Sequence, residues 1–352
     1  MRKVRWGILG VARIATTKVI PAMQQGELCE IAGIASRDPG RAEEAARTLG
    51  IPKAYGSYEE MLADPQIEAV YIPLPNHLHV PWSIRAAEAG KHVLCEKPIG
   101  LNANEALELI AARDRTGVVI GEAFMVQTHP QWVRTVELVR SGRIGPLRFA
   151  MGSFGYFQTA PENVRNVRES GGGGLMDIGC YPIKTSRMVF GEEPLRVSAT
   201  LVRDPDFGTD ILTSAILEYP SGHCVFACGT QVVPNQSMQF FGTTGRIEIE
   251  IPYNAPAGGT TRIRIDDGGD VLGSGITVVE FAPCDQYTIQ GDQFSRAIRE
   301  GSAPPVPLED SRRNMAVIDA VFRAAESGGW ETPAAAPCNG VPERRIRGSF
   351  SE

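Results

Sequence analysis

The stretch VRWGILGVARIA (residues 4–15) opens with an apolar run and then turns at a glycine. Residues 4–9 lack the alternation of polar and apolar side chains that marks a half-exposed strand, so they predict a strand buried on both faces. Gly10 follows this run, and a helical pattern begins at residue 12. A buried strand, a tight turn and a helix in this order form the opening unit of an α/β domain.

The same unit recurs through the first third of the chain. Apolar runs predict parallel strands over residues 4–9, 28–36, 69–72, 92–95 and 118–123. The intervening segments predict helices over residues 12–25, 39–49, 57–63, 80–89 and 102–116, and glycines stand just past four of them, as at helix ends. We expect residues 1–125 to form a Rossmann-type, doubly wound parallel sheet that binds ligand at the carboxyl ends of its strands.

The pattern changes near residue 130. After a helix over 130–141, polar and apolar residues alternate in the runs 147–156, 196–203, 211–219, 223–229, 238–242 and 246–251. Such alternation predicts a mainly antiparallel sheet packed on one face. Helical segments over 290–300 and 310–325 complete an expected α+β domain over residues 126–330. Residues 331–352, rich in Pro, Ala and Gly, are expected to form a C-terminal arm or tail.

Composition argues against several classes of protein. A chain of 352 residues is longer than a domain with one ordinary hydrophobic core, which agrees with two domains. A net charge of -6 argues against nucleic-acid binding, because neutralising phosphates requires an excess of Lys and Arg. No apolar run approaches the roughly 20 residues of a membrane span, and no signal-peptide core follows Met1. Seven scattered cysteines without a zinc-ligand spacing predict reduced thiols in a cytoplasmic protein with no bound metal.

The first turn carries an incomplete dinucleotide pattern. G-x-G-x-x-G/A is matched by Gly10, Ala12 and Ala15, with alanine in place of the middle glycine. The turn precedes a helix, whose N-terminus favours phosphate. We therefore expect a nucleotide pyrophosphate to lie against the backbone of Gly10, Ala12, Arg13 and Ile14.

The end of the second strand indicates whether the chain binds NAD(H) or NADP(H). An NAD-binding chain usually has a carboxylate there for the ribose 2′-hydroxyl, whereas this chain has Ser36 and Arg37. A hydroxyl and a guanidinium would bind a 2′-phosphate, and the guanidinium can lie against adenine. We expect NADP(H) to be preferred over NAD(H). In the alternative interpretation, Arg37 is solvated and Asp38 binds the ribose.

Two further strand ends carry polar residues. The turn after the third strand holds Leu74, Asn76 and His79, which are candidates for contacts with the nicotinamide ribose, although Asn76 would also suit a helix cap. Glu96 and Lys97 end the fourth strand at the edge where α/β sheets present ligands. A partly buried lysine there can transfer a proton or lower the pKa of a neighbouring hydroxyl; a solvated surface charge is the alternative.

A run of four glycines, residues 171–174, precedes the third candidate segment. Such a run is entropically costly, so it indicates unusual dihedral angles or a close approach beside a ligand. Asp177 and Tyr181 are four residues apart and would share one helical face, although Pro182 could kink the helix. In the alternative interpretation the glycines form a flexible loop, Asp177 only interacts with the helix dipole and Tyr181 belongs to the core.

These motifs together resemble the Gfo/Idh/MocA family of NAD(P)-dependent sugar enzymes. The resemblance covers nearly the whole chain and is carried by AGKHVLCEKPIG (89–100), PLPNHLH (73–79) and GGGGLMDIGCYPI (171–183). WGILGVARIA (6–15) and SRD (36–38) resemble the NADP-dependent branch that contains xylose dehydrogenases and dihydrodiol dehydrogenases.

The resemblance implies an NADP(H)-dependent oxidoreductase that transfers a hydride between the nicotinamide and a sugar or sugar-like polyol. Lys97, Asp177 and Tyr181 match the family's lysine, its aspartate and its histidine or tyrosine. A free phenol has a pKa near ~10, so Tyr181 as acid and base would need Lys97 to lower that value. Asp177 would orient the sugar or the lysine.

The resemblance also implies a large open sheet whose outer face pairs with another subunit in a homodimer or homotetramer. Weaker substrate candidates are the polar residues near the domain boundary and the glycine run: His129, Arg165, Asn166 and Arg168. The aromatic residues Phe154, Tyr156 and Phe157 could stack on a sugar ring. Two other functions stay open, namely a non-catalytic NAD(P)-binding sensor or scaffold and an NAD-recycling glycosidase. Neither the sugar or diol nor the direction of the reaction follows from the sequence.

Overall fold

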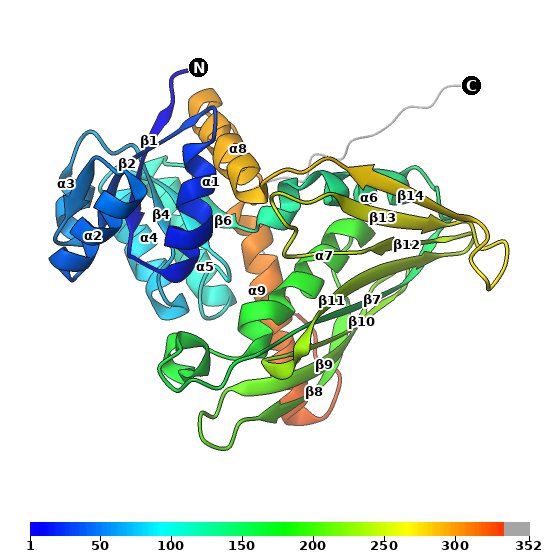
Figure 1. The fold of residues 1–352 in the computed structure, drawn as a ribbon. Coiled ribbons are helices and arrows are strands. Elements are labelled where there is room, and N and C mark those ends of the chain that lie inside the picture. The colour runs from blue at the N-terminus through cyan, green and yellow to red at the C-terminus, as the bar shows by residue number, and fades with distance from the viewer. Residues whose placement is uncertain (334–352) are drawn as a thin grey trace.

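The computed structural model describes residues 1–333, and these form two sheets that lie side by side (Figure 1). The first sheet is parallel throughout, in the order β3-β2-β1-β4-β5-β6, which is the Rossmann order. Its strands are β1 (Val4–Leu9), β2 (Cys29–Ala35), β3 (Lys53–Tyr55), β4 (Ala69–Ile72), β5 (His92–Glu96) and β6 (Ile120–Ala123). The predicted doubly wound sheet is confirmed.

The helices between these strands begin and end where the sequence indicates. They are η1 (Ala15–Val19), α1 (Ile20–Gln24), α2 (Pro39–Leu49), α3 (Tyr58–Ala63), η2 (Asn76–Leu78), α4 (His79–Glu88) and α5 (Ala103–Thr116). The side chains of Asp38 and Asn102 accept hydrogen bonds from the first turns of α2 and α5. Gly50 and Gly117 end the same two helices in the left-handed conformation.

The second sheet is the predicted large, mainly antiparallel one, in the order β14-β13-β12-β11-β7-β10-β9-β8. Its strands are β7 (Leu147–Phe157), β8 (Arg196–Arg203), β9 (Asp210–Glu218), β10 (His223–Gly229), β11 (Gln231–Gly242), β12 (Arg246–Ile249), β13 (Thr261–Asp266) and β14 (Ile276–Phe281). Only the pair β7 and β10 is parallel among these strands. Burial alternates along β7 and β9, so one face is packed and the other is open.

Helical segments of the second half pack on one face of this sheet or return to the first. They are η3 (Met125–Thr128), α6 (Pro130–Arg140), η4 (Val164–Asn166), η5 (Arg168–Ser170), η6 (Leu175–Gly179), α7 (Cys180–Phe190), α8 (Gln286–Glu300) and α9 (Leu308–Ser327). Helix α9 contacts α5, α7 and β8 and so lies against both halves (Figure 1). The structure also contains β13 and β14, for which the sequence predicted no strands.

Helix α8 ties the end of the chain to the Rossmann sheet. The Trp6 indole donates a hydrogen bond to the Ser295 hydroxyl at 3.1 Å, and both groups are buried. The Asp292 carboxylate accepts hydrogen bonds from the amides of Glu27 and Leu28 at 2.9 and 2.8 Å. These contacts hold α8 against β1 and against the amino end of β2.

The structure bears only in part on two predictions, the C-terminal arm and the absence of a membrane span. The predicted arm over 331–352 lies, from residue 334 onward, outside the described residues. Within residues 1–333, no helix combines the length and apolar composition needed to cross a membrane.

Candidate active site

A cavity of about 1490 Å³ lies between the two halves of the molecule. From the Rossmann half it is lined by residues 10–14, 36–38 and 73–76 and by Glu96 and Lys97, all of which follow or end β-strands. From the second half it is lined by 154–158, 163–165, 171–172, 177–178, 234–236 and single residues that include Tyr181, Asn254 and Tyr287. The sheet edge predicted to bind ligand therefore faces this cavity.

The turn after β1 has the shape that a nucleotide phosphate requires. Gly10 has φ +118°, and a Cβ built there would lie 2.9 Å from the Leu74 side chain. Ala12, Arg13 and Ile14 line the cavity beside it. Gly10 thus allows a positive φ and a close contact with Leu74 that a residue with a side chain would not, and the helix start that follows suits the pyrophosphate of a dinucleotide.

Four cations line the same end of the cavity: Arg13, Lys18, Arg37 and Arg41. Asp38 also lines it, but its carboxylate accepts a hydrogen bond from the Arg41 amide at 3.2 Å and caps α2. The Ser36 hydroxyl accepts a hydrogen bond from the Asp38 amide at 3.1 Å. The sequence analysis missed Lys18 and Arg41; the signal for Arg41 was its place in the first turn of the helix that follows Arg37.

His79, predicted as a cofactor contact, lines the cavity, but its ring nitrogens face the protein backbone. It is buried, and its two ring nitrogens lie 2.7 Å from the carbonyl oxygens of Leu74 and Pro98. Burial lowers the pKa of His79 to about 4. Because both nitrogens face backbone carbonyls, the ring braces the turns after β4 and β5 and has no nitrogen left for a ligand.

Asn76 joins the two halves of the cavity wall. Its side-chain amide donates a hydrogen bond to the Gly171 carbonyl at 2.8 Å. The glycine run is held tightly here: Gly171 and Gly173 have φ of +78° and +116°, and a Cβ on Gly172 would lie 2.5 Å from the Arg165 carbonyl oxygen. The predicted unusual dihedral angles and close approach are confirmed.

Lys97 and Asp177 meet at the centre of the cavity. The Lys97 ammonium donates hydrogen bonds to the Asp177 backbone carbonyl at 2.6 Å and to its carboxylate at 3.2 Å. The same carboxylate accepts hydrogen bonds from the Tyr156 hydroxyl and from Arg165 Nε, each at 2.7 Å. Although burial opposes ionisation, Arg165 and Lys97 hold the pKa of Asp177 well below its usual range.

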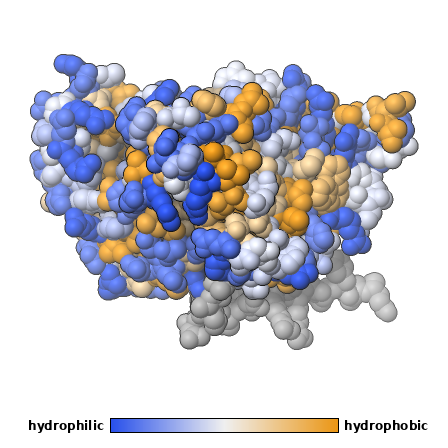
Figure 2. Space-filling view, turned by 90° about the horizontal axis from the view of Figure 1, so that it is seen from below, coloured by the Kyte–Doolittle hydropathy of each residue, from blue (hydrophilic) through white to orange (hydrophobic). Residues whose placement is uncertain are grey.

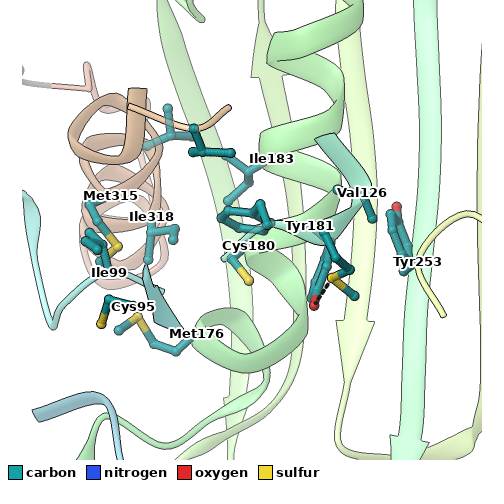
Figure 3. Close-up of a cluster of buried hydrophobic side chains, with 14 of the residues drawn as sticks. Cys95, Ile99, Val126, Met176, Cys180, Tyr181, Ile183, Tyr253, Met315 and Ile318 are labelled. Atoms are coloured by element: carbon teal, nitrogen blue, oxygen red, sulfur yellow. Dashed lines mark hydrogen bonds between the residues drawn. The ribbon is translucent and has the colours of Figure 1, made fainter. Parts of the chain in front are cut away.

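Tyr181 follows Asp177 by one helical turn and lines the same cavity. The Lys97 ammonium lies over its ring, 5.1 Å from the centroid, whereas its hydroxyl lies 3.5 Å from the Met125 sulfur. Figure 3 shows the hydroxyl at the edge of an apolar cluster, with Tyr253 beside the ring. Burial raises the pKa of Tyr181 well above its usual value.

The Lys97 ammonium does not contact the Tyr181 hydroxyl in this structure, so its expected effect on the phenol stays a prediction. The ammonium faces the ring instead of the hydroxyl, and two of its three N–H groups are directed at Asp177. Although burial disfavours the ammonium, Asp177 raises the pKa of Lys97 above its usual value.

Two buried carboxylates brace the turn that carries Lys97. Glu96 accepts hydrogen bonds from the Tyr71 hydroxyl at 2.6 Å and from the Lys97 amide at 3.2 Å. Glu122 in β6 accepts one from the Ile99 amide at 2.8 Å. Burial raises the pKa of Glu122 to about 7. The sequence analysis did not single out Glu122, because nothing local shows that it faces a neighbouring strand end.

Three weaker substrate candidates do not line the cavity. His129 caps α6 by accepting a hydrogen bond from the Gln131 amide, and its other ring nitrogen lies 3.5 Å from the Cys284 sulfur. The Asn166 amide donates to the Ala160 carbonyl at 2.8 Å, inside the loop. Arg168 lies in η5, behind the cavity wall. Arg165 and the predicted aromatic residues 154, 156 and 157 do line it.

Comparison with known families agrees with this geometry. Residues 4–124 match the model of an oxidoreductase family with an NAD-binding Rossmann fold, and residues 132–248 match the GFO/IDH/MocA C-terminal domain. The chain belongs to the Gfo/Idh/MocA family. It is an oxidoreductase with an NAD(P)-binding Rossmann domain, so the resemblance found in the sequence is confirmed.

Individual relatives of this Gfo/Idh/MocA protein span its length. An uncharacterized oxidoreductase of Rhizobium meliloti is 49% identical, covering 94% of this chain and 100% of the relative. A D-xylose 1-dehydrogenase (NADP(+)) of Haloferax volcanii is 38% identical, covering 92% and 98%. The solved structure of a 3-ketoreductase from Actinomadura kijaniata, in complex with NADP and TDP-benzene, has a TM-score of 0.85 at 29% identity, covering 92% and 98%.

Proposed function

We propose that this protein is an NADP(H)-dependent oxidoreductase that interconverts an alcohol and a carbonyl group on a sugar or sugar-like polyol. The observation that carries the proposal is the meeting of Lys97, Asp177 and Tyr181 in one cavity with the dinucleotide turn. The NADP-dependent xylose dehydrogenase among its relatives supports the choice of cofactor and of substrate class.

The nicotinamide, when bound, supplies the site that accepts or donates the hydride. Tyr181 acts as the acid in the direction of reduction, because its raised pKa keeps a proton on the phenol for a developing alkoxide. Lys97 has a third N–H beyond the two used by Asp177, and this group stabilises negative charge on the same substrate oxygen.

Asp177 holds Lys97 and Arg165 in place. Its carboxylate stays ionised and accepts hydrogen bonds from both cations. Oxidation of an alcohol requires Tyr181 to act as base. The phenol pKa would then have to fall when the cationic nicotinamide ring of the oxidised cofactor and the substrate occupy the site.

The preference for NADP(H) over NAD(H) rests on the second strand end. Ser36 and Arg37, with Arg41 beside them, offer a hydroxyl and two guanidinium groups to a 2′-phosphate. Asp38 serves the helix as its cap, which disfavours the alternative in which it binds a ribose.

The two alternative functions have distinct signatures. A sensor or scaffold would bind NADP(H) without turnover, and the acid and base groups Lys97 and Tyr181 in the cavity speak against it. An NAD-recycling glycosidase would hold its nucleotide through purification and would show no net reduction of added NADP.

We further propose a cytoplasmic homodimer or homotetramer, with a domain boundary near residue 125. Six cysteines in the described residues are unpaired, which agrees with a reducing compartment. The open face of the second sheet exposes Met151, Leu212 and Ile216, and Figure 2 shows apolar patches among hydrophilic residues. Light scattering on a sizing column distinguishes a dimer or tetramer from a monomer.

The test of the activity is a spectrophotometric assay at 340 nm. Purified enzyme is supplied with NADP or NAD and a panel of aldoses and diols, and with NADPH and a panel of ketosugars and anhydrosugars. We expect turnover with at least one neutral sugar or polyol and a higher kcat/KM for NADP(H) than for NAD(H). NADP binding without turnover on any of these compounds would contradict the proposal.

A further inference from the structure

One part of the cavity wall, which we call its second-half end, is lined by uncharged polar and aromatic side chains. They come from the loop after β7 and from β11 and its neighbour: Phe157, Gln158, Asn163, Pro234, Asn235, Gln236 and Asn254. Among the described residues that line this end, Arg165 is the one with a formal charge, and it is hydrogen-bonded to Asp177. We call Gln158, Asn163, Asn235 and Gln236 the amide wall.

Two glutamines of the amide wall are fixed through their oxygens. Gln158 Oε1 accepts a hydrogen bond from the Ala160 amide at 2.6 Å. Gln236 Oε1 accepts two, from the amides of Tyr253 at 2.9 Å and Asn254 at 3.0 Å. Each glutamine therefore keeps an Nε2 group with two N–H donors that bond to no other residue within 1–333.

The two asparagines are fixed in the same manner. Asn163 Oδ1 accepts a hydrogen bond from the Arg165 amide at 3.1 Å, so its Nδ2 donors remain. Asn235 Nδ2 donates to the Val233 carbonyl at 2.8 Å, so its Oδ1 acceptor remains. Backbone contacts thus hold all four side chains in place before a ligand arrives, which lowers the entropic cost of binding.

Neutral donors and an acceptor around an aromatic side chain suit a polyhydroxyl compound, since each hydroxyl both donates and accepts. A phosphate or diphosphate instead requires guanidinium or ammonium groups in the position it occupies. Arg13, Lys18, Arg37 and Arg41 line the cavity with the dinucleotide turn, where the proposed cofactor would carry its phosphates. The charge distribution therefore separates the cofactor's phosphates from the substrate.

We infer that the amide wall selects an uncharged, unphosphorylated sugar or polyol and disfavours sugar phosphates and nucleoside-diphosphate sugars. This inference rests on the proposed function and narrows its substrate class, and Gln236 is its central specificity-determining residue. Gln236 has its oxygen engaged twice, so the group it presents to substrate is the Nε2 donor pair.

Binding to the NADP-loaded enzyme tests the inference independently of turnover. Saturation-transfer NMR is recorded with D-xylose and D-glucose, and separately with D-glucose 6-phosphate and dTDP-glucose. We expect the neutral sugars to bind at least about tenfold more tightly than the two charged compounds. A tenfold difference in Kd corresponds to the loss of about one to two hydrogen bonds when a phosphate lies against the amide wall. Equal or tighter binding of either charged compound would overturn the inference, whether or not the enzyme turns over.

Gln236→Glu is the sharpest variant, because it keeps the oxygen that accepts from Tyr253 and Asn254 and replaces only the free donor. We expect KM for the neutral sugar to rise about tenfold while KM for NADP and the melting temperature stay unchanged. The matched control is Gln66→Glu, an exposed Rossmann residue whose oxygen accepts from Arg5. An unchanged KM for the sugar in Gln236→Glu contradicts the inference. If the wild-type enzyme binds neutral sugars as expected but does not oxidise or reduce any of them, the proposed function alone is contradicted.

Discussion

The buried Glu122 carboxylate predicts a pH dependence of the unfolding free energy whose magnitude follows from the structure. Its carboxylate is buried between β6, α7 and α9 and accepts a hydrogen bond from the Ile99 amide, two residues after Lys97. Burial raises its pKa to about 7 from an ordinary value of 4.5, against the opposing effects of Ser311 and Lys184 and with a further increase from Asp310. Replacing it by glutamine keeps the acceptor for Ile99 and removes the ionisation.

Proton binding in the folded and unfolded states decides whether stability rises or falls with pH. Between pH 4.5 and about 7 the folded protein keeps the proton that the unfolded chain has lost, so stability falls as pH rises through this window. Below pH 4.5 both states are protonated, and above 7 both are ionised, so this contribution no longer changes there. The difference of 2.5 pKa units corresponds to roughly 3 kcal/mol of stability that wild type loses across the window.

Urea unfolding at pH 5 and pH 8 measures this difference. We expect Glu122→Gln to gain roughly 2.5 kcal/mol over wild type on going from pH 5 to pH 8, because part of the change already occurs below pH 5. Glu108→Gln, at an exposed position on α5, serves as the control and should show no such gain. Parallel pH dependence of wild type and Glu122→Gln would refute the reasoning, since the carboxylate would then ionise as freely as in water.

Two further predictions concern the cofactor and the glycine run. Ser36→Asp puts a carboxylate where the 2′-phosphate is expected, so KM for NADP should rise at least about tenfold in the 340 nm assay while KM for NAD falls; an unchanged ratio would argue against a phosphate at this strand end. Gly172→Ala forces a Cβ to within 2.5 Å of the Arg165 carbonyl oxygen and should lower the unfolding free energy by about 1–3 kcal/mol. Gly258→Ala, where a Cβ would contact nothing within 4 Å, is its control, and equal stability of the two variants would contradict the crowding argument.

Local patterns were sufficient for the Rossmann half of the fold. Strands β1 and β4 have the bounds expected from the sequence, because both are short and almost wholly apolar runs. Strand β3 was not predicted, because it has only three residues and begins at the exposed Lys53. Strand β14 was missed because most of its side chains are exposed, so its pairing with β13 decides its conformation more than any local pattern does.

In the candidate site too, features fixed by local sequence were predicted and features that depend on distant segments were not. Lys97 was found because it ends a buried strand, and a strand end fixes the sheet edge on which a side chain lies. The orientation of the Tyr181 hydroxyl towards Met125 was not predictable, because it depends on a segment 56 residues away in the chain. The orientation of the His79 ring was not predictable for a similar reason, since the carbonyl of Pro98 that it faces belongs to the next strand end.

Tyr181→Phe tests the central claim most directly. The substitution removes the hydroxyl and leaves the ring under Lys97, so NADP(H) binding measured by fluorescence should change less than about twofold. Hydride transfer in a single turnover at 340 nm should slow by about 10²–10⁴-fold, the usual contribution of a general acid or base. Near-normal hydride transfer in this variant, with the cofactor bound, would contradict the assignment of proton transfer to this tyrosine.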